Sequence, residues 1–76
     1  MGAHMNNLRS VRRESKVTQS ELAVLMGTTQ AAISHYETGR RSPDLTTIRQ
    51  FVSVFSAKGI KTSVDELFPD ELSVIE

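Results

Sequence analysis

Residues 18–39 read TQSELAVLMGTTQAAISHYETG, and this stretch is the most informative part of the 76-residue chain. Thr18, with Glu21 three positions later, is the pattern of a capping box at the start of a helix. Gly27 then interrupts the helical pattern, because the residue that ends a helix commonly needs a positive φ, which glycine adopts at little cost. A second helix is predicted over residues 30–37. The stretch therefore predicts two short helices joined by a tight turn.

The spacing of small and apolar side chains indicates how these two helices pack. Ala23 is small enough to let the helices cross closely. Ile33 and Tyr36 lie three positions apart on one face of the second helix, from which they can pack back onto the first. Two short helices joined by a glycine-containing turn form a helix-turn-helix unit, whose second helix enters the major groove of DNA in proteins that use it to bind DNA. The combined spacing is the specific signal here.

The natural chain is expected to begin at Met5, because residues 1–4, Met-Gly-Ala-His, read as a cloning remnant. A first helix is then expected to end near Ser15, with Asn6 or Asn7 as its cap.

Two more helices are expected towards the C-terminus. The fourth has the strongest amphipathic pattern in the chain, carried by Leu45, Ile48, Phe51, Val52 and Phe55. Pro43 suits its first turn, with Ser42 as its cap. Ser63 can cap a short last helix. We therefore expect an all-α domain of five helices over residues 5–68, followed by an acidic and apolar tail, residues 69–76.

Length and composition exclude several classes of protein. About 70 residues form one small domain with a modest core, which leaves no room for a catalytic cleft and its scaffold. The chain has no cysteine, so disulfides and thiolate metal sites are excluded. Its apolar runs are too short to span a bilayer. We therefore expect a cytoplasmic protein with no membrane anchor, cofactor or metal.

An enzyme is not expected. His35 is the only histidine after the cloning remnant, and no second ligand or general base stands at a useful spacing from it. Ser34 beside His35 does not make a catalytic pair, because neighbouring side chains on a helix point about 100° apart.

The net charge of the chain is zero, but its distribution is uneven. Residues 5–43 hold six basic and three acidic side chains, a net charge of +3, whereas residues 44–76 hold three basic and six acidic ones, a net charge of −3. The positive half contains the helix-turn-helix pattern, as a surface that faces phosphates requires. The alternative is an uneven solvated surface without a partner.

The chain resembles the phage repressor and Cro-type helix-turn-helix family, also called the lambda-repressor-like or XRE type, in the pattern Thr18-Gln19-x-x-Leu22-Ala23-x-x-x-Gly27-Thr28-Thr29-Gln30-x-x-Ile33-Ser34-x-Tyr36-Glu37-x-Gly39-x-Arg41-x-Pro43. The resemblance covers nearly the whole chain from Met5 to about Phe68 and implies the five-helix fold of that family. Thr28 departs from the pattern, since the family often has an apolar residue there. The stretch after Phe68 has no obvious counterpart.

The resemblance implies which residues contact DNA. The positions from which the family contacts bases are held here by Gln30, Ala31, Ser34 and His35. Their chemistry agrees, because glutamine pairs bidentately with adenine, alanine meets a thymine methyl group, and serine and histidine offer hydrogen-bonding groups. The expected phosphate contacts are Thr18, Gln19, Thr29, Arg40 and Arg41, with Arg9 and Arg13 as weaker candidates. The alternatives are that Gln19 is merely a good helix former and that His35 is merely solvated.

Arg12 and Glu37 are expected to form a structural ion pair. The family often pairs an arginine of the first helix with this glutamate. A carboxylate on the inner edge of a helix is costly to bury unless it is paired. The two residues are therefore assigned to stability rather than to binding.

Double-stranded DNA and a second copy of the chain are the expected partners, because two-fold dimers on near-palindromic sites extend the small footprint of one domain. The predicted dimer interface consists of Gly59, Ile60, Lys61, Leu67, Phe68, Leu72 and Val74. These assignments predict a sequence-specific transcriptional regulator, a repressor acting as a homodimer. The alternative is an antitoxin or adaptor that binds a partner protein through the tail.

Overall fold

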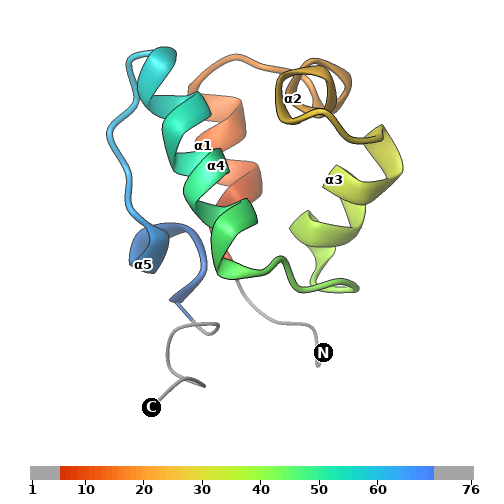
Figure 1. Ribbon diagram of the computed structural model, residues 1–76. Coiled ribbons are helices and arrows are strands. Elements are labelled where there is room, and N and C mark those ends of the chain that lie inside the picture. The colour runs from red at the N-terminus through yellow and green to blue at the C-terminus, as the bar shows by residue number, and fades with distance from the viewer. Residues whose placement is uncertain (1–5, 70–76) are drawn as a thin grey trace.

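The computed structural model describes residues 6–69, which form five helices and no strand (Figure 1). The helices are α1 (Leu8–Glu14), α2 (Gln19–Met26), α3 (Gln30–Thr38), α4 (Leu45–Ala57) and α5 (Val64–Leu67). The predicted all-α, five-helix fold is therefore confirmed. No helix in this part of the chain has the length and apolar character needed to cross a membrane.

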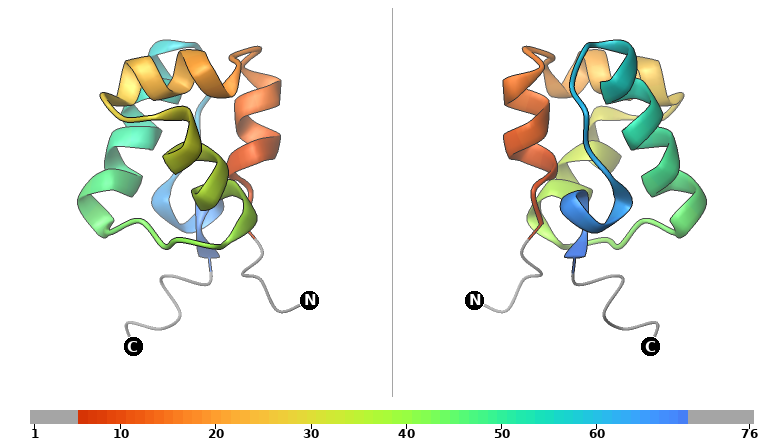
Figure 2. Two further views of the ribbon diagram at one scale, coloured as in Figure 1. Left: turned by 90° about the vertical axis from the view of Figure 1, so that its right-hand side faces the viewer. Right: turned by 90° about the vertical axis from the view of Figure 1, so that its left-hand side faces the viewer.

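The helices surround one core. In Figure 2, α2 lies across the top of the domain, α1 and α4 descend on either side, α3 occupies one face, and α5 lies on the opposite face. The close packing pairs agree with this view, because α3 packs on α2 and α1, while α4 packs on α2 and α5. This arrangement leaves the outer side of α3 at the surface of the molecule.

The turn between α2 and α3 has the geometry that its glycine predicts. Gly27 has φ 70° and ψ 34°, in the left-handed region. Its N–H donates to the carbonyl of Val24, and the N–H of Thr28 donates to the carbonyl of Ala23, which completes a Schellman motif. A Cβ on Gly27 would meet nothing within 4 Å. The backbone angle, and not lack of space, therefore favours glycine at this position.

The starts of α2 and α5 follow the predicted caps, whereas at α1 Asn7 takes the predicted cap position without a side-chain capping bond. Thr18 accepts the N–H of Glu21 at 3.0 Å, and the Glu21 carboxylate accepts the N–H of Thr18 at 2.9 Å, which is the predicted capping box. The hydrogen bond from the backbone of Thr18 favours the charged carboxylate and lowers the pKa of Glu21. Ser63 caps α5, as predicted, by accepting the N–H of Glu66.

The predicted cap of α4 is wrong. The cap is Asp44, not Ser42, and its carboxylate accepts the N–H of Thr47 at 2.8 Å. The helix begins at Leu45, so Pro43 lies before its first turn, where its ring is buried. The reason is that two good capping residues stand close together, and the register in which the apolar face of α4 reaches the core selects the later one.

The core is built from the inner faces of all five helices. Its largest fully buried side chains include three phenylalanines. The ring centres of Phe55 and Phe68 lie 6.4 and 6.2 Å from that of Phe51, and the rings are roughly parallel to it. The ring of Tyr36 meets Phe51 edge-on at 6.0 Å, which ties α3 to α4. The buried apolar set is Leu8, Val17, Leu22, Ala23, Met26, Ala32, Ile33, Ile48, Phe51, Phe55, Leu67 and Phe68.

This core requires a correction to the predicted dimer surface. Leu67 and Phe68 are 0% and 2% exposed, because they close the core of their own chain beneath α4. They are therefore not free to contact a second copy in this fold. Leu72 and Val74, with nearly all of the predicted tail, lie outside the described residues, as does the predicted cloning remnant.

Candidate nucleic-acid interface

The recognition face predicted on α3 lies at the surface, on the side shown toward the viewer in the left panel of Figure 2. Ala32 and Ile33 are buried, whereas Gln30 and Ala31 are exposed. The remaining predicted base contacts, Ser34 and His35, are half-buried one turn further along α3. Positions one turn apart share a face of a helix. All four predicted base-contact residues thus lie along one outward stripe.

Three of the predicted phosphate-contact residues lie at helix starts, and two of them adjoin the stripe, because Thr29 caps α3 and Gln19 lies within hydrogen-bonding distance of Gln30. Thr18 and Thr29 are the exposed caps of α2 and α3, and Thr29 accepts the N–H of Ala32 at 3.1 Å. Gln19 is the first residue of α2 and is half-buried. The first N–H groups of a helix and its dipole favour an anion at such a position.

Arg40 and Arg41 lie at the other end of α3, both exposed. Gly39 ends the helix with φ 81°, and the N–H of Arg41 then donates to the carbonyl of His35 at 3.2 Å. The guanidinium of Arg41 sits over the ring of Tyr36, 5.6 Å from its centre. A cation held on an aromatic face in this way is oriented while its outer N–H groups stay in solvent.

The predicted ion pair between Arg12 and Glu37 is present. Arg12 Nε lies 2.5 Å from Glu37 Oε2, and its Nη2 lies 3.3 Å from Oε1. The side chain of Glu37 is 0% exposed and that of Arg12 only 11% exposed. Burial alone would raise the pKa of Glu37, but hydrogen bonds from Arg12 and its neighbours outweigh burial and hold the pKa below its ordinary value. Glu37 is therefore a buried carboxylate in its charged form.

Two further donors to Glu37 were not anticipated from the sequence. Arg9 Nε donates to Oε1 at 3.3 Å, and Gln19 Nε2 donates to the same oxygen at 3.0 Å. Arg9, a weaker candidate for phosphate contact, is thus partly engaged inside the protein. A possible signal was that a buried carboxylate has more acceptor capacity than one guanidinium fills.

A hydrogen-bonded link between α2 and α3 was also missed. Gln30 Nε2 donates to Gln19 Oε1 at 3.3 Å, and the hydroxyl of Ser20 donates to Gln30 Oε1 at 2.9 Å. Gln19 therefore bridges the predicted base-contact residue Gln30 and the buried Glu37. The sequence held one hint, since Gln19 and Gln30 each open one of two helices that meet closely.

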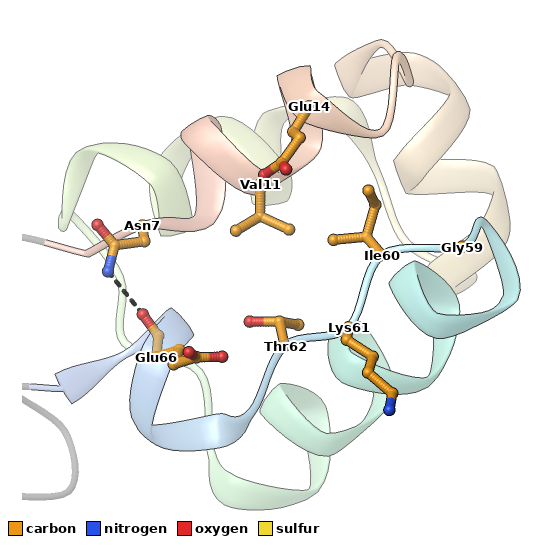
Figure 3. Close-up of a pocket in the computed structure, with 8 residues that line it drawn as sticks. All are labelled: Asn7, Val11, Glu14, Gly59, Ile60, Lys61, Thr62 and Glu66. Atoms are coloured by element: carbon orange, nitrogen blue, oxygen red, sulfur yellow. Dashed lines mark hydrogen bonds between the residues drawn. The ribbon is translucent and has the colours of Figure 1, made fainter.

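A pocket of about 430 Å³ lies away from α3, between α1 and the segment that joins α4 to α5 (Figure 3). Its lining residues are Asn7, Val11, Glu14, Gly59, Ile60, Lys61, Thr62 and Glu66. The side chain of Asn7 closes one end by donating to the carbonyl of Glu66 at 2.6 Å. Within residues 6–69, no three metal-ligating side chains gather into a group.

The comparison with protein families agrees with this geometry. A family model described as Helix-turn-helix matches residues 8–56, which is more than half of the chain and extends from α1 nearly to the end of α4. A search of the curated proteins found no match. The matched family is one of DNA-binding regulatory domains and is not enzymatic. The chain therefore belongs to the XRE and lambda-repressor-like helix-turn-helix family and is a DNA-binding transcriptional regulator.

Proposed function

We propose that the protein is a repressor that binds a near-palindromic operator as a homodimer and reads bases with the outward stripe of α3. The observation that carries this proposal is the exposed pair Gln30 and Ala31 in the first turn of α3, where Gln30 also contacts Gln19 at the start of α2. Residues in the first turns of a recognition helix are those that reach base edges.

The side chains on this stripe suit a particular set of base contacts. Gln30 complements adenine, donating to N7 and accepting from the N6 amino group, and Ala31 suits the methyl group of thymine. Ser34 can donate or accept and so discriminates weakly. His35, one turn beyond Ala31, can donate to a guanine N7 or to a phosphate. An operator half-site that contains an adenine near the first turn of α3 fits these groups best.

Thr18, Gln19 and Thr29 would hold the phosphates at one end of α3, and the basic loop of Arg40 and Arg41 would hold them at the other. These contacts carry no base information and fix the register of α3 in the groove. The support is that the net positive half of the chain contains both groups. Each arginine that neutralises a phosphate adds about one to the slope of log affinity against log salt.

A second copy would pack through the segment Gly59–Lys61, beside the pocket in Figure 3. Ile60 and Lys61 line that pocket, with Ile60 half-buried and Lys61 exposed. This segment is on the opposite side of the molecule from the free surface of α3, apart from the proposed reading stripe. Lys61→Glu is expected to weaken a dimer here without changing which base pairs one half-site prefers.

Selection of bound sequences from a random duplex pool tests the proposal. The expected result is a two-fold symmetric consensus with half-sites about one helical turn apart. A consensus without symmetry would overturn the homodimer, and no enrichment would overturn sequence-specific reading. An adaptor or antitoxin that does not bind DNA itself would show no steep loss of affinity with salt.

A further inference from the structure

We propose that the buried Glu37 is a specificity-determining positioning residue, which acts through Gln19 to fix the direction of the Gln30 side-chain amide before DNA binds. The inference rests on the proposed role of Gln30 as the residue that reads adenine. Glu37 does not need to touch a base for this role. It acts through the hydrogen bonds that join α2 to α3.

A relay of three hydrogen bonds, all donated in the same direction, joins the side chains of Ser20, Gln30, Gln19 and Glu37. Ser20 donates to Gln30 at 2.9 Å, Gln30 donates to Gln19 at 3.3 Å, and Gln19 donates to Glu37 at 3.0 Å. The relay runs from the exposed residues Ser20 of α2 and Gln30 of α3 to the side chain of Glu37, which is 0% exposed.

The buried end sets this direction, because a carboxylate accepts hydrogen bonds and donates none. Glu37 is kept charged by Arg12 and Arg9, both of which donate to it. Gln19 must therefore turn its nitrogen toward Glu37 and its oxygen toward Gln30.

The direction then passes along the relay to the surface. Since Gln19 offers an oxygen, Gln30 must turn its own nitrogen inward and its oxygen toward Ser20. The hydroxyl of Ser20 can donate or accept, and here it donates. The reversed order would place two amide oxygens or two amide nitrogens against each other. The amide of Gln30 is thus held in one of its two possible orientations.

This orientation matters because adenine and guanine differ at one hydrogen-bonding group in the major groove. Adenine presents the N7 acceptor and the N6 donor, whereas guanine presents the acceptors N7 and O6. Gln30 retains one free N–H and one free oxygen lone pair, which complement adenine. With guanine the fixed oxygen would face O6, and the relay prevents the amide from turning its nitrogen toward that group.

The experiment measures the affinity ratio of the full chain for two duplexes that differ by an adenine-to-guanine change at the base pair read by Gln30. That base pair is identified first, as the position at which Gln30→Ala loses preference. Ser20→Ala removes the donor to Gln30, and Gln19→Met breaks the link to Glu37 while keeping the side-chain length. Ser53→Ala, an exposed serine of α4 outside the relay, is the matched control.

Gln19→Met is expected to lower the adenine-to-guanine ratio by about fivefold, the equivalent of one ordinary hydrogen bond. Ser20→Ala should largely keep the ratio, because the Ser20 hydroxyl can bond either end of the Gln30 amide and does not select its direction. Loss of a phosphate contact in Gln19→Met would weaken both duplexes alike, so the ratio separates the two roles. Glu37→Gln should also lower the ratio, because a carboxamide can donate to Gln19 and allow the reversed relay. Ser53→Ala should leave the ratio unchanged.

The outcomes separate this inference from the function on which it rests. If Gln30→Ala leaves base preference intact at every position, base reading by Gln30 is wrong. If Gln30→Ala relaxes preference while folded Gln19→Met and Glu37→Gln keep the full ratio, Glu37 does not set specificity. Circular dichroism establishes that each variant is folded, and if Glu37→Gln does not fold, Gln19→Met decides.

Discussion

The α2–α3 unit and the α4–α5 half of the domain are held together by different kinds of interaction. Between α2, α3 and α1 the main polar link is a directed set of hydrogen bonds and an ion pair that converge on Glu37. Between α4 and α5 the contacts are apolar and largely aromatic, centred on Phe51. Apolar packing depends on shape and area, whereas hydrogen bonds also depend on which atom donates. The helix-turn-helix unit is therefore the half in which atom identity matters as well as volume.

Removing Phe51 should have the largest effect on stability. Phe51→Ala deletes a fully buried ring that contacts Phe55, Phe68 and Tyr36, and should lower the free energy of unfolding by about 3–5 kcal/mol. Urea denaturation followed by circular dichroism measures this loss. At temperatures where the variant is folded, its base preference should match the parent. A changed preference would show that the two halves are not separable.

Removing Glu37 should come next. Glu37→Ala leaves the guanidinium of Arg12 buried without its partner, so the free energy of unfolding should fall by about 3 kcal/mol. The same denaturation measurement applies. A change within about 0.5 kcal/mol, the range of an ordinary surface substitution, would show that the ion pair is not structural. The control is Arg13→Ala, because Arg13 is an exposed arginine of α1, the helix that holds Arg12.

Acid should weaken the polar half through the same carboxylate. Because the pKa of Glu37 is lower in the folded protein than in the unfolded chain, its contribution to stability is complete above the unfolded pKa. That contribution is lost as the pH falls toward the folded pKa. Asp44, whose pKa is lowered by its capping bonds to Thr47, acts in the same direction. Between pH 7 and pH 3, the free energy of unfolding should fall less for Glu37→Gln than for the parent.

The reading stripe itself should affect specificity and not stability. Gln30→Ala is expected to cost about 1–3 kcal/mol of discrimination at one base pair. Fluorescence anisotropy with duplexes changed at single positions measures this cost. The melting temperature should barely move, since Gln30 is exposed. Equal losses on all duplexes would instead assign Gln30 to the phosphate backbone.

The smallest expected effect is on the basic loop. Arg41→Ala should weaken binding to all sequences alike and lower the salt slope by about one. The loss of its contact with the Tyr36 ring should change stability little, because that contact is exposed to solvent. Affinity measured at several salt concentrations checks both points. A change of preference at one base pair would place Arg41 in the groove.

Features set by neighbours along the chain could be predicted from the sequence. The capping box of Thr18 and Glu21, the left-handed Gly27 and the outward position of Gln30 all follow from interactions within a few residues. The error at the start of α4 has the same origin. Ser42 and Asp44 are both good caps, and local reasoning cannot choose between them without knowing where the apolar face of α4 meets the core.

The amino-acid sequence by itself determined the helix-turn-helix and its buried and exposed faces, whereas the pairing of Arg12 with Glu37, 25 positions apart, was expected only from the family resemblance. The three-dimensional fold settled which surface each apolar residue covers, so that Leu67 and Phe68 close their own core. It also settled how Gln19, Gln30 and Glu37, separated by 11 and 18 positions, join in one directed relay. The physical reason is range, since helical periodicity and capping act over one turn, whereas hydrogen bonds between helices depend on how those helices cross.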